Sequence, residues 1–348
     1  MSLAADGLPE GKKSSRSRKP ARSSAATWRD LAAALAGARQ RPLPAGFAPQ
    51  LCIQRASPPR GEGWLHETKW DGYRIVAVGA KGKVRLWSRN AIEWTHKVPE
   101  LAQAVASLGA HSLQLDGEMV VLRGERDDFN ALQARLSAEN ADPAIYVVFD
   151  VPHLNGHSLR KVPLLERKEI LEKLLRSHPH PLLRYSEHQI GNGAAALARA
   201  ISKGYEGIIS KRTQSPYCGT RNGDWVKVKD RPSDEFVVIG YTEPKGTRSG
   251  LGALLLAKPL DGRLVYIGRV GTGFTDALLR ELRKQLEAAR VKETPADLTL
   301  MDRKDRAEAR WTRPKIVVEV FYQGLGSTGL LRQPAFKTMR LDKKVKDL

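Results

Sequence analysis

The sequence has little cysteine, no long apolar run and fewer acidic than basic residues. Cys52 and Cys218 are the only cysteines in 348 residues, so we expect no disulfide framework and a reducing compartment. No apolar run approaches the roughly 20 residues that span a bilayer, and no apolar block follows the first charged residues as it does in a signal peptide. These absences predict a cytoplasmic protein with no membrane partner.

The shortage of acidic residues leaves a large positive charge. Lys and Arg number 58 and Asp and Glu number 38, which gives a formal net charge of +20. A surplus of this size attracts a polyanion, and nucleic acid is the usual polyanion for a soluble protein. The simpler alternative is a basic charge that serves solubility or is confined to a tail.

The length and local composition predict two domains behind a basic arm. Residues 1–26 hold few apolar side chains and several lysines and arginines, so we expect them to be disordered. Thr27–Asp30 resembles a capping box and predicts an alanine-rich helix that runs to about Arg39. This helix and a linker would occupy residues 27–43.

Residues 44–231 and 232–348 differ in pattern. The first segment alternates short strands and helices, which indicates a compact α+β domain. The second has several short strands around one helix, from about Asp276 to Arg290, which is typical of a small closed barrel. Because the OB-fold is the commonest nucleic-acid-binding barrel of this size, we predict an OB-fold domain here.

The stretch from His66 to Arg74 contains a lysine, Lys69, that is a candidate nucleophile. A lysine attacks only after burial or nearby cations lower its pKa from about 10.4. Apolar and aromatic neighbours such as Trp64, Trp70 and Tyr73 predict a strand that ends at a partly buried pocket. The alternative is an ordinary hairpin with one solvated lysine.

Two acidic motifs interrupt or open apolar strands. Asp116-Gly117-Glu118 is predicted to interrupt the strand from Ser112 to Leu122, and two carboxylates there are costly unless a metal or a ribose hydroxyl binds them. The alternative is an ordinary Asp-Gly turn. Glu206 opens a second buried strand that Lys211 closes, which makes a candidate pair for metal and phosphate.

Cationic and aromatic residues supply the other parts of a site. Lys227 and Lys229 lie two residues apart in a predicted strand, so they share a face, and an anion such as a triphosphate would relieve their repulsion. A solvated strand face is the alternative. Arg89 follows a strand end, where it could bind phosphate or lie on the surface. Phe149 could stack on a base or belong to the core.

Taken together and in this order, these motifs resemble the series found in covalent nucleotidyltransferases. The closest resemblance is to ATP-dependent DNA ligases and, within them, to the ligase module of the bacterial end-joining protein ligase D. It extends over most of residues 60–230, and the carboxyl end is similar to the terminal motif of ligases. The segments that carry it are Lys69–Arg74, Ser88–Asn90, Asp116–Glu118, Phe149–Asp150, Glu206–Lys211, Tyr217–Arg221, Trp225–Lys229, Leu331–Lys337 and Arg340–Lys343.

The resemblance implies a three-step reaction. Lys69 would attack the α-phosphate of ATP, the AMP would pass to a 5′-phosphate of DNA, and a 3′-hydroxyl would displace it. It also implies Mg²⁺ or Mn²⁺ on Glu118 and Glu206, and catalytic roles for Lys227, Lys229, Asp342 and Lys343. ATP-binding roles fall on Glu67, Arg74, Arg89, Glu118, Phe149, Lys211, Lys227 and Lys229. DNA-binding roles fall on Arg74, Arg89, Arg221 and Arg332.

The partners implied by the resemblance are nicked or broken duplex DNA and a Ku-type end-binding protein, with a monomeric enzyme at the bacterial nucleoid. Two other functions fit parts of the pattern. An mRNA-capping guanylyltransferase shares the lysine chemistry and the OB domain but uses GTP. A DNA-binding protein without activity explains the charge and the barrel, but gives Glu118, Glu206 and the internal lysines no purpose.

Overall fold

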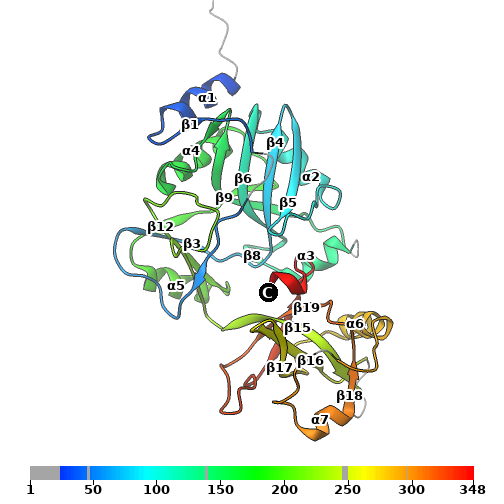
Figure 1. The fold of residues 1–348 in the computed structure, drawn as a ribbon. Helices are drawn as coiled ribbons and strands as arrows, with labels where there is room; N and C mark the ends of the chain where they lie inside the picture. Colours follow the sequence, from blue (N-terminus) through cyan, green and yellow to red (C-terminus); the bar gives the residue numbers. More distant parts are fainter. Residues whose placement is uncertain (1–23, 45–47, 138–139, 245–249, 295) are drawn as a thin grey trace, which may run out of the picture.

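The computed structural model describes residues 24–44, 48–137, 140–244, 250–294 and 296–348. Figure 1 shows two parts, one above the other, with the carboxyl end of the chain between them. The upper part contains the helices and strands up to residue 229, and the lower part those from residue 233 onward. The predicted disordered arm falls mostly on residues 1–23, which lie outside the described residues.

The first sheet of the upper part has seven strands in the order β1-β10-β9-β6-β4-β5, with β11 beside β9. Helices α1, α2 and α4 contribute side chains to its core, which contains the fully buried Ile75, Leu115 and Val148. The strands are β1 (Arg39–Gln40), β4 (Tyr73–Ala80), β5 (Lys83–Ser88), β6 (Ser112–Val120), β9 (Ile145–Leu154), β10 (His157–Ser158) and β11 (Leu183–Tyr185), and the helices are α1 (Ser24–Ala34), α2 (Pro99–Ala106) and α4 (Leu164–Ser177).

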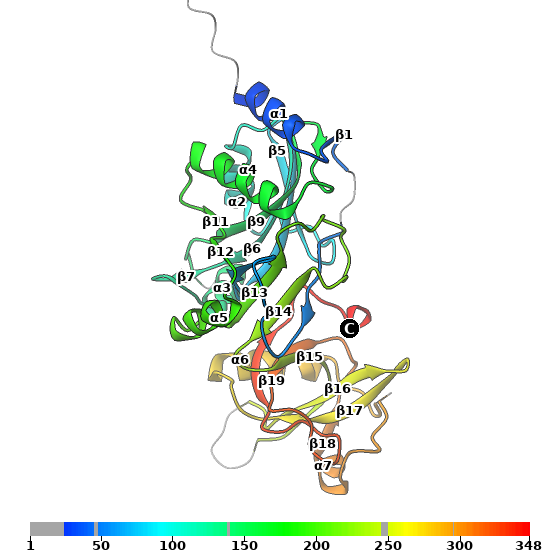
Figure 2. The same ribbon diagram turned by 90° about the vertical axis from the view of Figure 1, so that its left-hand side faces the viewer.

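The second sheet has five strands, and its two faces differ because side chains alternate along a strand. One face packs Ile208 and Val226 against Ala196 and Ala200 of a helix, while the other carries polar side chains. The strands, in sheet order, are β12 (His188–Ile190), β3 (Trp64–Thr68), β13 (Gly207–Arg212), β14 (Trp225–Lys229) and β2 (Ile53–Gln54), and the helix is α5 (Gly193–Ser202). Figure 2 shows α5 outside β13 and β14.

A short hairpin and a helix lie between β6 and β9 of the first sheet in the chain order. The hairpin consists of β7 (Leu122–Arg123) and β8 (Arg126–Asp127), and α3 (Phe129–Leu136) follows it. The carboxylate of Asp128 accepts a hydrogen bond of 3.0 Å from the backbone N–H of Ala131, so Asp128 caps this helix.

The lower part is a third sheet in the order β17-β16-β15-β19-β20, with β18 beside β15. Leu279, Leu282 and Leu286 of α6 pack with Phe236 and Val318 of the sheet. Its elements are β15 (Ser233–Thr242), β16 (Leu254–Leu260), β17 (Arg263–Val270), α6 (Asp276–Ala288), α7 (Arg303–Glu308), β18 (Ala309–Trp311), β19 (Val317–Phe321), β20 (Ala335–Met339) and the 3₁₀ turn η1 (Val345–Asp347).

The sequence predicted a closed barrel, but this sheet does not close. Among the described residues no ladder joins β17 to β20. Two single backbone hydrogen bonds join the edges instead, from Leu331 N–H to Ile267 O at 2.9 Å and from Phe336 N–H to Thr272 O at 2.8 Å. A five-residue β20 that follows a turn-rich segment is too short to pair along the whole of β17.

Two local predictions were also wrong. The first helix spans Ser24–Ala34 rather than residues 27–39, because Gly37 has a φ of +88° and its backbone passes against Lys161 O, where a Cβ would lie at 2.7 Å. The Asp116-Gly117-Glu118 motif does not interrupt its strand, since β6 continues through it and absorbs the irregularity as shifts in register against β9. In the described part of the chain, no helix has the length and apolar character to cross a membrane.

Candidate active site

A cavity of about 390 Å³ lies where the three sheets meet, and this volume falls within the range of small-ligand sites. Glu206, Asp342 and Arg332 do not line it, although Glu206 contacts Lys69, which does. The other predicted site residues do line it, namely Glu67, Lys69, Arg74, Arg89, Glu118, Phe149, Lys211, Arg221, Lys227, Lys229 and Lys343.

Strand pairing explains why residues far apart in sequence meet here. Glu67 of β3 and Lys227 of β14 both lie opposite Ile209 of the intervening β13, so the three side chains share one face of the second sheet. Arg74 and Glu118 are opposite each other in β4 and β6 of the first sheet. The cavity therefore lies between polar faces of two sheets.

Lys69 is held at the end of β3 by backbone contacts. Its N–H donates to Gly207 O at 3.0 Å. Three residues on, Gly72 passes so close to Met119 O that a Cβ would lie 2.1 Å from it, which explains the glycine of the motif. The Lys69 side chain is 17% exposed, and its Nζ lies 2.5 Å from Oε2 of Glu206.

The prediction that its surroundings lower the pKa of Lys69 was wrong for this structure. Burial and the ammonium of Lys337 lower that pKa, but the carboxylates of Glu206, Asp71 and Glu319 raise it, and the net change is upward. A carboxylate in contact stabilises the ammonium form. Lys69 is therefore protonated here and must lose this ion pair before it can act as a nucleophile.

Arg74 is held by Asp116, one of the two carboxylates that were predicted to bind a metal ion or a ribose hydroxyl. Its Nε and Nη2 donate to the two oxygens of Asp116 at 2.5 and 2.6 Å, and Tyr217 OH donates to Asp116 Oδ2 at 2.6 Å. The guanidinium carbon lies 4.5 Å from the centre of the Phe149 ring. Asp116 and Tyr217 thus position Arg74, a role that the sequence analysis missed.

Glu118 differs from Asp116, because it forms no ion pair with any described residue. Burial raises the pKa of its carboxyl to about 7, and only the fields of Arg74 and other cations oppose that effect. In the part of the chain that the structure describes, His, Cys, Asp and Glu form no group of three or more that could hold a metal ion. Glu118 and Glu206 therefore do not form a preassembled metal centre.

The Glu67 side chain is engaged by other protein groups. Its carboxylate lies 2.6 Å from Lys168 and 2.7 Å from Lys211, and it accepts a hydrogen bond of 3.1 Å from Ser186 Oγ. The Lys211 ammonium in turn lies 4.3 Å from the centre of the Phe149 ring. Lys168 comes from α4 and belongs to none of the motifs identified in the sequence.

Lys227 and Lys229 share a face as predicted but have different partners. Burial and the ammonium groups of Lys229 and Lys69 lower the pKa of Lys227 to about 8, and no described side chain forms an ion pair with it. Lys229 lies 2.9 Å from both Glu206 and Glu319. Of these two lysines, Lys227 is thus the one whose charge is available for an incoming anion.

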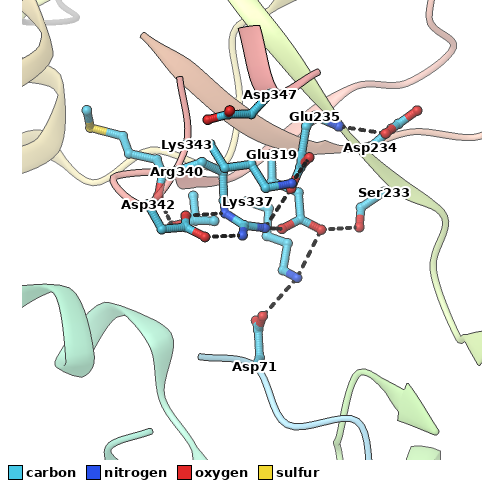
Figure 3. A network of polar contacts seen from close by, with 12 residues as sticks. Asp71, Ser233, Asp234, Glu235, Glu319, Lys337, Arg340, Asp342, Lys343 and Asp347 are labelled. Atoms are coloured by element: carbon cyan, nitrogen blue, oxygen red, sulfur yellow. Dashed lines mark hydrogen bonds and ion pairs between the residues drawn. The ribbon is translucent and has the colours of Figure 1, made fainter. Parts of the chain in front are cut away.

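The third sheet completes the site through Lys337 of β20 (Figure 3). Its ammonium lies 3.0 Å from Asp71, 3.2 Å from Glu206 and 3.3 Å from Glu319. Since Asp71 and Glu206 belong to the upper part of the molecule and Glu319 to the lower, Lys337 bridges the two. Its side chain is only 6% exposed, so the bridge is screened little by solvent.

The predicted terminal residues lie beside this bridge (Figure 3). Asp342 binds Arg340 at 2.9 and 2.7 Å, and its backbone O accepts a hydrogen bond of 2.8 Å from Asn90 Nδ2. Lys343 lines the cavity and pairs with Glu235. Lys343 thus faces the cavity, whereas the Asp342 carboxylate holds Arg340.

Three of the four predicted DNA-binding arginines line the cavity, and the fourth does not. Arg89 lines the cavity, and burial lowers its pKa. Arg221 lines it too and donates to Cys52 O at 2.5 Å. Arg332 is exposed on the loop before β20, outside the cavity. The structure therefore brings Arg74, Arg89 and Arg221 together but not Arg332.

Comparison with known proteins identifies matching families and relatives. Residues 53–229 match the model of the ATP dependent DNA ligase domain, and residues 247–343 match the ATP dependent DNA ligase C terminal region. The multifunctional non-homologous end joining protein LigD of Pseudomonas aeruginosa is 40% identical over 311 residues, which are 88% of this chain and 37% of that protein. The LigD of Mycolicibacterium smegmatis is 33% identical over 304 residues, 86% of this chain and 39% of that protein.

A solved structure of mycobacterial DNA ligase D, complexed with ATP and MES, is 32% identical and has a TM-score of 0.66. The match covers 87% of this chain and 97% of that one. In contrast, the chain spans only about two fifths of the length of the two LigD relatives. The predicted fold, a nucleotidyltransferase domain followed by an OB-fold domain, is confirmed apart from barrel closure. Because the first family model alone covers more than half of the residues, this chain belongs to the family of ATP-dependent DNA ligases.

Proposed function

We propose that this chain seals DNA breaks that carry a 5′-phosphate and a 3′-hydroxyl, with Lys69 as the residue that carries AMP. The observation that carries this proposal is the position of Lys69, whose side chain reaches a cavity lined by cations from all three sheets. Lys69 attacks the α-phosphate of ATP and pyrophosphate leaves. The AMP then moves to the 5′-phosphate, and attack by the 3′-hydroxyl forms the phosphodiester and releases AMP.

The cations around the cavity have separate tasks in the first step. Lys227, without an ion-pair partner among the described residues, binds the α-phosphate, and Lys211 adds charge from the second sheet. Phosphate oxygens also compete with Glu206 for Lys229, and the Glu206 carboxylate must release Lys69 before attack. Cations at fixed positions stabilise charge that develops on the phosphate without costly reorganisation. Phe149 and the backbone at Glu67 hold the base.

Glu118 and Glu206 fit a divalent cation that arrives with the nucleotide. Mg²⁺ typically takes one or two carboxylates and completes its shell with substrate phosphate and water. The Glu118 carboxylate lines the cavity and has no ion-pair partner among the described residues. Bound Mg²⁺ or Mn²⁺ would neutralise polyphosphate charge and polarise the reacting phosphate. Glu206, beside Lys69, would supply carboxylate oxygens to such an ion after releasing the lysines that it binds in this structure.

We further propose a cellular role in double-strand break repair by end joining. Support comes from the relatives named as non-homologous end joining proteins and from the net charge of +20. The substrates would be nicked or broken duplex DNA at the bacterial nucleoid, with a Ku-type end-binding partner and a monomeric enzyme. The division between the domains would fall at residue 231, between β14 and β15.

Nucleotide labelling tests the proposal and separates it from a capping-type guanylyltransferase. The protein is incubated with α-labelled ATP, GTP or NAD⁺ and separated by denaturing electrophoresis. We expect label from ATP alone, and none in Lys69→Ala, because we assign Lys69 as the nucleophile and the other cavity lysines to binding of the phosphates. Lys284→Ala, an exposed change on α6, serves as the control. Label from GTP, or label retained by Lys69→Ala, would reject the assignment.

A further inference from the structure

Behind the cavity lies a buried group of charges that contains two lysines for one carboxylate. Lys168 of α4, Glu67 and Lys211 have side chains that are 0%, 2% and 1% exposed. Glu67 pairs with Lys168 at 2.6 Å through Oε1 and with Lys211 at 2.7 Å through Oε2. Lys168 also donates to Ser186 O at 2.9 Å.

The group keeps one unit of positive charge away from water. The next carboxylate, Asp150, does not supply the missing negative charge, because Arg167 binds both of its oxygens at 2.7 and 2.8 Å. A buried charge without a partner is expensive. Aromatic rings offset part of this cost, since the Lys211 ammonium lies 4.3 Å from the centre of Phe149 and 4.1 Å from that of Trp225.

The excess charge is accessible to a ligand at Lys211 only. Lys211 lines the cavity, whereas Lys168 lies behind Glu67 and does not. Were Glu67 bound to Lys211 alone, the pair would be neutral and would attract an anion weakly. Because Lys168 takes a share of the same carboxylate, the Lys211 ammonium keeps charge that an anion in the cavity can use.

We propose that Lys168 is a positioning residue for nucleotide binding, which acts by sharing Glu67 and thereby leaves Lys211 charged toward the phosphates of ATP. This inference rests on the proposed function and deepens it. Lys168 touches neither the cavity nor the nucleotide, so its effect passes through Glu67.

Charge-neutralising variants test this role, with binding of α,β-methylene-ATP measured by calorimetry. In Lys168→Met the remaining Glu67–Lys211 pair is neutral, and we expect about tenfold weaker binding, as for one charge acting over a few ångströms in a partly buried site. The double variant Lys168→Met with Glu67→Gln restores the net charge, and we expect its affinity to return to near that of the wild type. Lys168→Arg, which keeps the charge, should also bind normally.

If Lys168 has a purely structural role, the double variant should bind the analogue no better than Lys168→Met does. That result would overturn the inference, as would normal binding by a folded Lys168→Met. If Lys168→Met does not fold, the double variant decides the matter, because binding tenfold weaker than wild type would again overturn the inference. Failure of the wild type to bind the analogue or to become labelled with AMP would instead reject the proposed function.

Discussion

The two buried charge groups around the cavity differ in which parts of the chain build them. Glu67, Lys168 and Lys211 all come from the nucleotidyltransferase domain, so folding of that domain is enough to assemble them. Glu206, Glu319 and Lys337 meet only when the OB domain lies against it. The first group is therefore permanent, and the second depends on the arrangement of the domains.

This difference assigns the groups to different stages of the reaction. Lys343 and Arg340 of the OB domain line the same cavity as Lys69, and in the proposed mechanism a nick must reach the AMP on Lys69 in the second step. The OB domain must then move and separate the charges of the second group. Contacts between the domains accordingly serve the step that uses ATP, while contacts within the nucleotidyltransferase domain persist through all three.

The largest expected effect concerns the terminal residues of the OB domain. We expect Asp342→Ala and Lys343→Ala to lose about 100-fold in self-adenylation, the size typical of one lost electrostatic contact in a transition state. The resemblance to ligases implies that these terminal residues orient the pyrophosphate of ATP as it leaves. Both variants should therefore still seal a nick that already carries AMP on its 5′-phosphate, because that step involves no pyrophosphate. Assays of both reactions on the same preparations provide the measurement.

Arg332→Ala is the matched control, since Arg332 belongs to the same domain but lies outside the cavity. It should adenylate normally. If the terminal residues only grip DNA, Asp342→Ala and Lys343→Ala will adenylate normally and fail on either nick. For Asp342 we expect the loss to act through Arg340, which would keep Glu235 and Glu319 as its carboxylate partners.

A second prediction uses the pKa of Lys227 in the nucleotidyltransferase domain. Because burial and neighbouring cations lower it to about 8, Lys227 loses its charge as pH rises through 8, and bound ATP favours the charged form. Affinity for α,β-methylene-ATP should thus fall between pH 8 and 9.5, by at most about tenfold per pH unit. Calorimetry across this range measures it.

Lys227→Arg should remove this decline, because arginine stays charged throughout. Burial raises the pKa values of Glu118 and Asp127 to about 7 and 6. We assign any change in affinity for the analogue at lower pH to these two carboxyl groups. An equal alkaline decline in the arginine variant would show that another group titrates.

The sequence predicted the nucleotidyltransferase side of the site better than the OB side. Alternation along β14 placed Lys227 and Lys229 on one face, and the motif order brought Lys69, Arg74 and Glu118 into one cavity. Such patterns are local, since each depends on neighbours within one strand. The same patterns do not show which strands pair, so the positions of Ile209 and Lys227 opposite each other came only from the structure.

The missed features depend on contacts between distant segments. The pKa of Lys69 rises because Glu206, 137 residues away, reaches its ammonium. Lys168 lies on a helix with no motif of its own, and Lys337 meets Asp71 across the domain boundary, 266 residues away. No short sequence pattern reports these pairings. The expected barrel closure failed for a related reason, because strand count does not determine which edges meet.

A third prediction tests whether Lys337 holds the domains together. Lys337→Met leaves Asp71, Glu206 and Glu319 with one cation fewer, and the cost of unpaired buried carboxylates should loosen the closed arrangement. We expect a larger radius of gyration by small-angle X-ray scattering and faster proteolysis near Arg231. Lys284→Met, exposed on α6, should change neither. An unchanged radius in Lys337→Met would mean that other contacts suffice.

The smallest expected effect separates the arm from the folded domains. Residues 1–26 carry six lysines and arginines and two acidic residues, while Arg89 and Arg221 of the folded domains line the cavity. Binding to nicked duplex should weaken steeply with salt, since each neutralised phosphate contributes about 0.9 to the slope of log affinity against log salt. Deletion of residues 1–26 should lower that slope by one such increment for each arm cation that contacts DNA, and leave self-adenylation unchanged because Lys69 and the cations assigned to ATP belong to the folded domains. Fluorescence anisotropy at several salt concentrations measures both slopes.

Equal slopes for the full chain and the deletion variant would place all DNA contacts on the folded domains. A flat slope in the full chain would contradict the inference drawn from the net charge.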